Sequence, residues 1–170
     1  MKKEPDLISS SVYDGRKAKV EWFDLDGGVI PDIAPDKWQV ARIFANEGGK
    51  LVMAYNPGNK HHSYEIPGGH YEEYDKDVVA TFFRKFDEET NGEIIDWSTI
   101  GYQVRTDESG HQDYQLFVFA NVKNTSRNIE DPGGGVTRSE LVELDDFAKY
   151  INWGEIGQRI VYLIRDKFIV

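Results

Sequence analysis

The sequence contains no cysteine. This absence excludes disulfides, thiolate-held metal ions and thiol nucleophiles together. A chain without cysteine fits a reducing compartment better than a secreted scaffold, so we expect a cytoplasmic protein. The first residues, MKKEP, turn polar at once with no apolar stretch behind them, and no signal peptide is expected. The chain also lacks an apolar run of membrane-spanning length, which predicts no membrane association.

The sequence also has fewer positively charged than negatively charged residues. The chain has 20 Lys and Arg against 30 Asp and Glu, which gives a formal net charge of −10 at pH 7. Because neutralising many backbone phosphates needs a basic face, we do not expect an extended nucleic acid as partner. A small anionic substrate remains compatible, since a metal ion and a few local cations can hold one diphosphate on an acidic protein.

The length of 170 residues suits one domain with its own core. We expect a single domain over residues 1–170, with residues 1–37 as an N-terminal arm or strand extension and residues 38–170 as the core. Residues 1–16 are expected to form a mobile arm or an early edge strand, and residues 17–23 a strand.

Alternating and short apolar runs predict strands through most of the core. The sequence at residues 46–49, NEGG, predicts a hairpin between the first two of these strands. Strands interrupted by one mid-chain helix and closed by a terminal helix predict an α/β fold, an α/β/α sandwich with a mixed β-sheet. The expected core strands are residues 38–45, 51–55, 64–66, 100–106, 113–122 and about 141–144.

The most regular helical pattern extends from residue 76 to residue 90. Asp75 or Asp77 is expected to cap its start, and Asn91 and Gly92 to end it. A last helix is predicted from apolar residues that recur at helical spacing. The expected apolar faces are Val78, Val79, Phe82, Phe83 and Phe86 in the first helix, and Ile156, Ile160, Val161 and Ile164 in the last.

Glycines and carboxylates at this mid-chain helix predict its chemistry. Gly68 and Gly69 allow a sharp turn whose N–H groups can approach an anion, and we expect the positive end of the helix to point back at that turn. Asp87, Glu88 and Glu89 lie near the end of the helix. Carboxylates on one side of a helix, completed by waters and phosphate oxygens, are a usual way to bind Mg²⁺. Such a metal would neutralise a diphosphate and lower the pKa of an attacking water.

Residues 64–69 (YEIPGG) and 84–92 (RKFDEETNG) together resemble the signature of the Nudix hydrolases. That signature has a glycine-containing turn, a helix with an Arg-Glu pair, then a Glu-Glu pair, a short residue and a glycine. The resemblance implies the α/β/α sandwich of that family from about residue 38 to the C-terminus. It also implies hydrolysis of a nucleoside diphosphate linked to another moiety, with Mg²⁺ or Mn²⁺ as cofactor and a small-molecule diphosphate as substrate.

The sequence departs from the family pattern in three places. Lys85 stands where the family has an acidic residue next to its arginine. One extra residue separates the turn from Arg84, and Asn91 separates Thr90 from Gly92.

Two alignments of the signature are possible. With gaps, Phe86 takes the apolar position, and Glu88 and Glu89 form the Glu-Glu pair. Without a gap from the turn, Asp75 takes the place of the family's first glutamate, Asp87 and Glu88 replace the Glu-Glu pair, and Arg84 falls on the acidic position. We prefer the gapped alignment, and Glu88 is a metal candidate in both.

Lys85 precedes Glu88 and Glu89 by three and four residues, so its ammonium group can pair with either carboxylate. A cation at this place repels an incoming Mg²⁺ at short range. Three outcomes are open: a weaker metal site, a site completed by acidic residues from elsewhere, or no catalysis. The candidates for added acidic residues are Glu72, Glu73, Asp75, Glu130 and Asp131.

The resemblance and the helix chemistry together give a predicted site. Glu88, Glu89 and Arg84 are the predicted catalytic residues, with Arg84 orienting a carboxylate; Glu88, Glu89 and Asp75 are predicted metal ligands; Gly68, Gly69 and His70 are predicted to contact the substrate.

Two other interpretations remain open from the sequence. Lys85 favours a module that keeps the scaffold, has lost turnover and binds a nucleotide or a protein. A third interpretation is a structural domain whose strand at residues 17–23 pairs across a homodimer.

Overall fold

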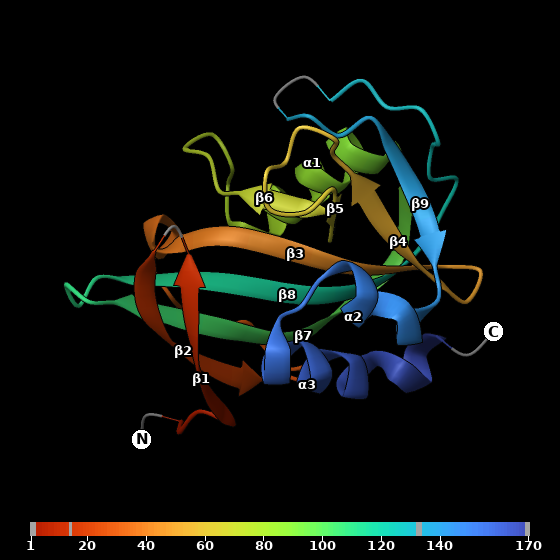
Figure 1. The fold of residues 1–170 in the computed structure, drawn as a ribbon. Helices are drawn as coiled ribbons and strands as arrows, with labels where there is room; N and C mark the ends of the chain where they lie inside the picture. The colour runs from red at the N-terminus through yellow and green to blue at the C-terminus, as the bar shows by residue number, and fades with distance from the viewer. Residues whose placement is uncertain (1–2, 14, 132–133, 169–170) are drawn as a thin grey trace.

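The computed structural model describes residues 3–13, 15–131 and 134–168. Within these residues, nine strands form one mixed sheet in the order β1-β2-β7-β8-β3-β4-β5, while β6 pairs with β3 and β9 with β4 (Figure 1). The strands are β1 (Leu7–Tyr13), β2 (Arg16–Asp24), β3 (Trp38–Glu47), β4 (Lys50–Tyr55), β5 (Tyr64–Glu65), β6 (Gly68–His70), β7 (Glu93–Asp107), β8 (Gln112–Lys123) and β9 (Arg138–Val142).

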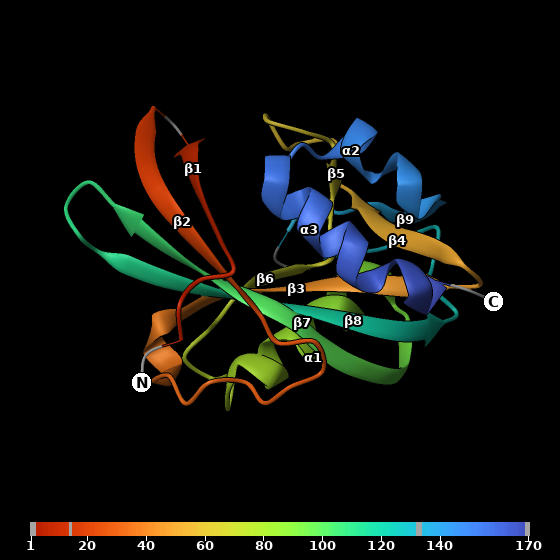
Figure 2. The ribbon, with the colours of Figure 1, turned by 90° about the horizontal axis from the view of Figure 1, so that it is seen from below.

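Helices cover both faces of this sheet (Figures 1 and 2). They are α1 (Val78–Thr90), α2 (Phe147–Tyr150) and α3 (Gly154–Ile164), with short 3-10 turns η1 (Pro35–Lys37), η2 (Leu144–Asp146) and η3 (Arg165–Phe168). The pairing of β3 with β8 is parallel, whereas the other strand pairs among the described residues are antiparallel. The predicted α/β/α sandwich with a mixed sheet is therefore confirmed. None of the described helices is long and apolar enough to cross a membrane.

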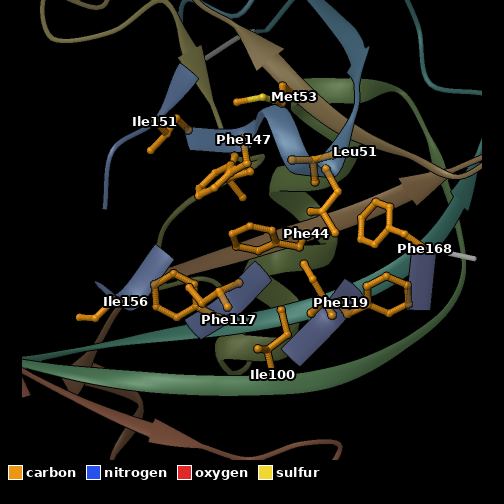
Figure 3. Packing of buried hydrophobic residues seen from close by; sticks show 14 of the residues in the cluster. Phe44, Leu51, Met53, Ile100, Phe117, Phe119, Phe147, Ile151, Ile156 and Phe168 are labelled. Atoms are coloured by element: carbon orange, nitrogen blue, oxygen red, sulfur yellow. The ribbon is translucent and has the colours of Figure 1, made fainter. Parts of the chain in front are cut away.

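Alternation along the central strands supplies two apolar cores, one on each face of the sheet. On β3, Ile43 packs with Phe82 of α1, whereas Phe44 packs on the other face with Phe147. The rings of Phe44 and Phe147 lie 5.5 Å apart in a T-shaped arrangement, at the centre of the cluster in Figure 3. Truncating a fully buried phenylalanine such as Phe82 typically costs about 3–5 kcal/mol, so both layers depend on these contacts.

The predicted hairpin at residues 46–49 is confirmed, because β3 and β4 pair through Asn46 with Leu51 and through Glu47 with Lys50. Beyond these two pairs β4 diverges from β3. The earlier part of β3 pairs instead with β6, at positions 40–42. This exchange of neighbours brings the glycine turn next to the centre of the sheet.

The strand predicted at residues 100–106 is only the second half of β7, which begins at Glu93. Its first half carries exposed polar residues, and two bulges interrupt its pairing with β8, between Ile94 and Asp96 and between Thr99 and Gly101. A bulge shifts which residues face the core, so the period-two pattern is lost there.

The N-terminal segment forms a hairpin of β1 and β2. The prediction of an early edge strand within residues 1–16 is confirmed, because β1 occupies the edge of the sheet. The prediction that residues 17–23 pair across a homodimer is wrong. Both edges of β2 are used within the chain, since Val20 pairs with Ser9 of β1 on one side and with Arg105 of β7 on the other.

Helix α1 follows its predicted limits closely. Asp77 is the N-cap, and its Oδ1 accepts the N–H of Ala80 at 2.8 Å. At the other end Asn91 has a φ of 51°, the left-handed conformation that closes many helices. The predicted apolar face needs one correction, because Phe83 is 41% exposed while Phe82 is fully buried.

Candidate functional site

The glycine turn is built by the close approach of β6 to β3. Gly68 has a φ of 145°, and a Cβ atom added to it would lie 2.1 Å from the carbonyl oxygen of Ala41. No side chain larger than hydrogen fits this contact with a neighbouring backbone. The N–H of Ile43 also donates to the Pro67 carbonyl at 2.8 Å, which ties the start of the turn to β3.

A carboxylate of α1 holds this turn from the other side. Oε2 of Glu89 accepts the N–H of Gly68 at 2.9 Å, and Glu89 is only 7% exposed. Burial raises the pKa of Glu89 to about 8, although the Gly68 N–H and the charges of Arg42 and Lys85 act in the opposite direction. The expectation that the positive end of α1 points at the turn is therefore wrong. The turn lies against the C-terminal half of the helix because residues 71–76 return along it before α1 begins.

Asp75 and Arg84 form a two-pronged ion pair. Arg84 Nε donates to Oδ1 of Asp75 at 2.8 Å, and Arg84 Nη2 donates to Oδ2 at 2.6 Å. The Asp75 carboxylate is buried and also accepts the hydroxyl of Thr81 and the N–H of Glu72. The hydrogen bonds from Arg84 lower the pKa of Asp75 to about 2 despite its burial. Both oxygens of Asp75 are thus engaged within the protein.

Arg84 connects this pair to the rest of the site. Its Nη1 donates to Oε1 of Glu88 at 3.2 Å, and its Nη2 donates to the carbonyl oxygen of His70 at 3.2 Å. One guanidinium therefore orients Asp75, Glu88 and the end of β6 together. The role predicted for Arg84, orienting a carboxylate, requires such contacts, and the role itself stays a prediction.

Lys85 lies directly over the turn. Its Cδ and Cε atoms cover the α-carbon of Gly69, so that a Cβ added there would lie 2.9 Å from each. Its Nζ donates to Oε2 of Glu88 at 2.8 Å. Burial lowers the pKa of Lys85, but the hydrogen bond and charge of Glu88 outweigh it and leave the pKa above its ordinary value. The lysine is therefore charged at neutral pH and paired with Glu88.

Glu88 is consequently shared by two cations. Burial raises its pKa, but the hydrogen bonds from Lys85 and Arg84 dominate, and its pKa lies below the ordinary value. Its side chain is 26% exposed, so it still reaches solvent at the surface of α1. It is a charged carboxylate, available to a divalent ion only in competition with Lys85 and Arg84.

The geometry fits a metal ion that is held jointly with a substrate. Within residues 3–13, 15–131 and 134–168, no group of three or more histidine or acidic side chains is placed to hold a metal. Among these residues, no third acidic side chain therefore joins Glu88 and Glu89 in a metal-holding group. Mg²⁺ is commonly bound through one or two carboxylates plus waters and substrate phosphates. Glu88 offers one charged carboxylate, whereas Glu89, with its pKa raised to about 8 by burial, would have to lose a proton before it could act as the second ligand. A site held by protein atoms alone does not fit.

Of the residues predicted to contact substrate, Gly68 has its N–H occupied by Glu89, and Gly69 is covered by the Lys85 stem. His70 is exposed, and it lines a hollow on the opposite face of the sheet end from α1. Of these three residues, His70 is therefore the one with an exposed side chain at the hollow.

Sequence reasoning missed two charged residues beside the turn, Arg42 on β3 and Glu65 on β5. Their charges act on Glu89 and on each other. A signal for Arg42 was present, because a charged residue in the middle of the apolar run at residues 38–45 needs a reason to be there. Glu65 carried no such signal, since its place next to the site comes from the pairing of β5 with β4.

Comparison with known proteins gives a consistent picture. The profile of the NUDIX domain matches residues 35–162. No curated protein matches the sequence. Among solved structures, the pyrophosphohydrolase BsRppH of Bacillus subtilis is 14% identical with a TM-score of 0.63, and the alignment covers 94% of this chain and 97% of that one. A NUDIX hydrolase from Nitrosomonas europaea is also 14% identical with a TM-score of 0.60, over 77% of this chain and 90% of that one. At such identities the structural likeness concerns the fold.

Proposed function

The chain belongs to the NUDIX family, and from that premise we propose that it is a hydrolase of diphosphate linkages. The substrate class that we propose is a nucleoside diphosphate derivative or a similar small molecule, with Mg²⁺ or Mn²⁺ as cofactor. The absence of cysteine supports the cytoplasm as its place of action.

The observation that carries this proposal is the bond between Glu89 and Gly68. It joins a carboxylate of α1 to the glycine turn at 2.9 Å and sets Glu88 beside that turn. An isolated pair of glutamates at a helix end would be ordinary surface. A buried glutamate tied to a backbone that admits only glycine is a built arrangement, and such arrangements cluster at functional sites.

Each residue has a defined task in this proposal. Glu88 and Glu89 would hold the metal ion together with the substrate phosphates, and the ion would supply charge neutralisation and a more acidic water. Arg84 keeps Glu88 oriented and ties it to Asp75 and to the His70 carbonyl. Asp75 acts through Arg84 and is a positioning residue.

The test is hydrolysis of a panel of nucleoside diphosphate derivatives by purified protein, with Mg²⁺, with Mn²⁺ and with EDTA. We expect turnover of at least one compound that stops in EDTA, and a loss of at least a hundredfold in Glu88→Gln. Glu93→Gln is the matched control, because Glu93 is an exposed glutamate paired with Lys123 away from the turn. Absence of metal-stimulated turnover, or full activity in Glu88→Gln, would exclude the enzyme.

A second candidate function is favoured by the ion pair between Lys85 and Glu88. Its 2.8 Å contact places a cation beside the carboxylate that a divalent ion would need. A protein with this arrangement could bind a nucleotide or a protein partner without catalysing a reaction. Calorimetry separates the two functions: ligand binding that is equal in Mg²⁺ and EDTA, with no product, supports the binding module.

A further inference from the structure

Strand β1 is an open edge of the sheet. Among the described residues it pairs only with β2 and stands at the end of the strand order, whereas β5, at the opposite end, has just two residues. The seven residues of β1, LISSSVY, include no charged residue and no proline. In such a strand every second residue directs its N–H and C=O groups away from the neighbouring strand. Proteins usually protect long edges with charges, proline or a covering element, so the edge of β1 is one that a further strand can join.

Two apolar side chains of β1 lie exposed on one face of the sheet. Ile8 is 57% exposed and Val12 is 66% exposed. The pairing with β2 places Glu21 beside Ile8 and Lys17 beside Val12. Because neither of these β2 neighbours is apolar, the pairing within the chain leaves the two apolar side chains uncovered.

The residues of β1 are arranged symmetrically about Ser10. Ser9 and Ser11 flank it, and the apolar residues Ile8 and Val12 follow on either side. When two copies of the strand pair antiparallel around a two-fold axis at Ser10, Ile8 of each copy lies opposite Val12 of the other. A two-fold interface uses the same patch on both copies, so a strand that pairs with itself needs this symmetry. The symmetry favours a second copy of this chain over an unrelated extended peptide.

The charges beside β1 also suit such a pair. Across the two copies one row of the sheet would read Glu21, Ile8, then Val12 and Lys17 of the second copy, so the apolar pair lies between opposite charges. Lys19, which lies beside the two-fold axis, is already paired with Glu21 at 2.8 Å. The two Lys19 side chains would be three strand spacings apart, about 14 Å, which exceeds the Debye length of about 10 Å at 0.1 M salt. Like charges are therefore not opposed, although the chain as a whole carries −10.

Space for a second strand exists beside β1. Figure 2 shows β1 on the side of β2 that faces the α2–α3 segment. A hollow of about 480 Å³ lies there, lined by residues 9–12 of β1 and by Trp153 and Gly154 across from them. The central side chains of a second β1 that would point towards this hollow are Ser9 and Ser11, and both are small.

We propose that β1 joins two copies of this chain into a two-fold symmetric dimer, by antiparallel pairing centred on Ser10. Each copy adds its sheet to that of the other, and Ile8 packs against Val12 of the second copy. The NUDIX match begins at residue 35, so this interface belongs to a hairpin outside the matched region. The proposal does not rest on hydrolysis, because β1 lies outside the predicted metal and catalytic residues.

The first test is analytical ultracentrifugation of the full chain over a range of concentrations. We expect wild type to form a dimer, and Ile8→Lys to weaken it at least about tenfold without a change in its circular dichroism spectrum, because Ile8 is exposed. Val29→Lys is the matched control, since Val29 is 90% exposed and lies outside β1. It should leave the dimer unchanged. A wild type that stays monomeric, or a dimer that Ile8→Lys does not weaken, overturns the proposal.

A charge exchange across the interface tests which residues meet. In Ile8→Lys/Val12→Glu the lysine of each copy lies opposite the glutamate of the other, so we expect the dimer to be at least about tenfold more stable than in Ile8→Lys alone. Ile8→Lys/Val12→Lys is the control, because two lysines then meet, and it should stay monomeric. Equal dissociation constants in the two double variants overturn the pairing of Ile8 with Val12.

Single cysteines report the register directly, because the chain has none of its own. In Ser10→Cys the two thiols face each other at the two-fold axis, with α-carbons about 4.5–5.5 Å apart, a separation that a disulfide spans. In Ile8→Cys the two cysteines are four residues apart along the strands, about 13 Å, which a disulfide does not span. We expect diamide to convert Ser10→Cys into a covalent dimer on a non-reducing gel and to leave Ile8→Cys monomeric. Cross-linking of both variants at the same rate, or of neither, overturns the register.

Discussion

The ammonium nitrogen of Lys85 lies 2.8 Å from Oε2 of Glu88, one helical turn away on α1. The pair is partly buried, and the stem of the lysine is held against Gly69. Glu88 is the predicted metal ligand in both alignments of the signature. Lys85 is therefore paired with the carboxylate on which the proposed function depends. If the proposed metal ion binds at this helix, its affinity would depend on how readily Lys85 releases Glu88.

Replacing this lysine should strengthen metal binding. Two unit charges 4 Å apart interact by about 4 kcal/mol at an effective dielectric constant of 20, so exchanging a cation for a carboxylate is a large local change. We expect Lys85→Glu to bind Mg²⁺ at least tenfold more tightly than wild type, measured by calorimetry. Lys85→Gln, which removes the charge without adding a ligand, should fall between the two. Equal Mg²⁺ affinity in all three proteins would show that Lys85 does not control the site.

The ion pair of Asp75 with Arg84 should make stability depend on pH. The pKa of Asp75 falls from 3.8 to about 2 on folding, so the folded state binds this proton less tightly. Its contribution, about 2 kcal/mol, is fully present above pH 4 and is lost as the pH falls towards 2. We expect Asp75→Asn to lower the free energy of unfolding by about 2 kcal/mol at pH 7, in urea denaturation. The difference from wild type should shrink between pH 4 and pH 2.

The control for this experiment is Asp36→Asn, because Asp36 is an exposed aspartate far along the chain from the site. It should change the free energy of unfolding by less than about 0.5 kcal/mol. A deficit in Asp75→Asn that stays constant from pH 7 to pH 2 would contradict the assigned role of the ion pair.

Gly68 should tolerate no side chain. In Gly68→Ala the new Cβ would meet the carbonyl oxygen of Ala41 at 2.1 Å, and both partners are backbone atoms that cannot turn aside. We expect a loss of more than about 3 kcal/mol in urea denaturation, together with loss of any hydrolytic activity. Gly110→Ala is the matched control, because Gly110 also has a positive φ, of 83°, but has no atom near its Cβ position. Its cost should be about 1 kcal/mol, and equal costs at the two positions would disprove the packing argument.

Local patterns in the sequence predicted the parts of the site that lie close together in the chain. The apolar spacing of α1, its cap at Asp77 and its end at Asn91 all follow from contacts within a few residues. The same holds for the β3–β4 hairpin. Phe83 is the exception within α1, because its place at the margin of the apolar face is decided by which neighbours reach it.

The direction from which the turn approaches α1 could not be predicted in the same way. Residues 71–76 determine which end of the helix meets Gly68, and they have no regular pattern. The expectation that the N-terminus of α1 points at the glycine turn was therefore wrong. Instead Glu89, near the C-terminus of α1, accepts a hydrogen bond from the N–H of Gly68. Asp75 was likewise predicted as a metal ligand from its place in the signature. The structure shows that both of its carboxylate oxygens accept hydrogen bonds from Arg84.

The sequence by itself determined the type of site, because the glycine turn and the Glu88-Glu89 pair belong to one short segment whose chemistry is local. It also determined the conflict at Lys85, whose spacing from Glu88 on a helix makes their contact nearly unavoidable. Only the tertiary structure decided what surrounds that segment. Arg42 and the β1–β2 hairpin come from distant parts of the chain and meet through pairing of β3 with β6 and of β2 with β7. Such pairings depend on the packing of the whole sheet, and no short segment encodes them.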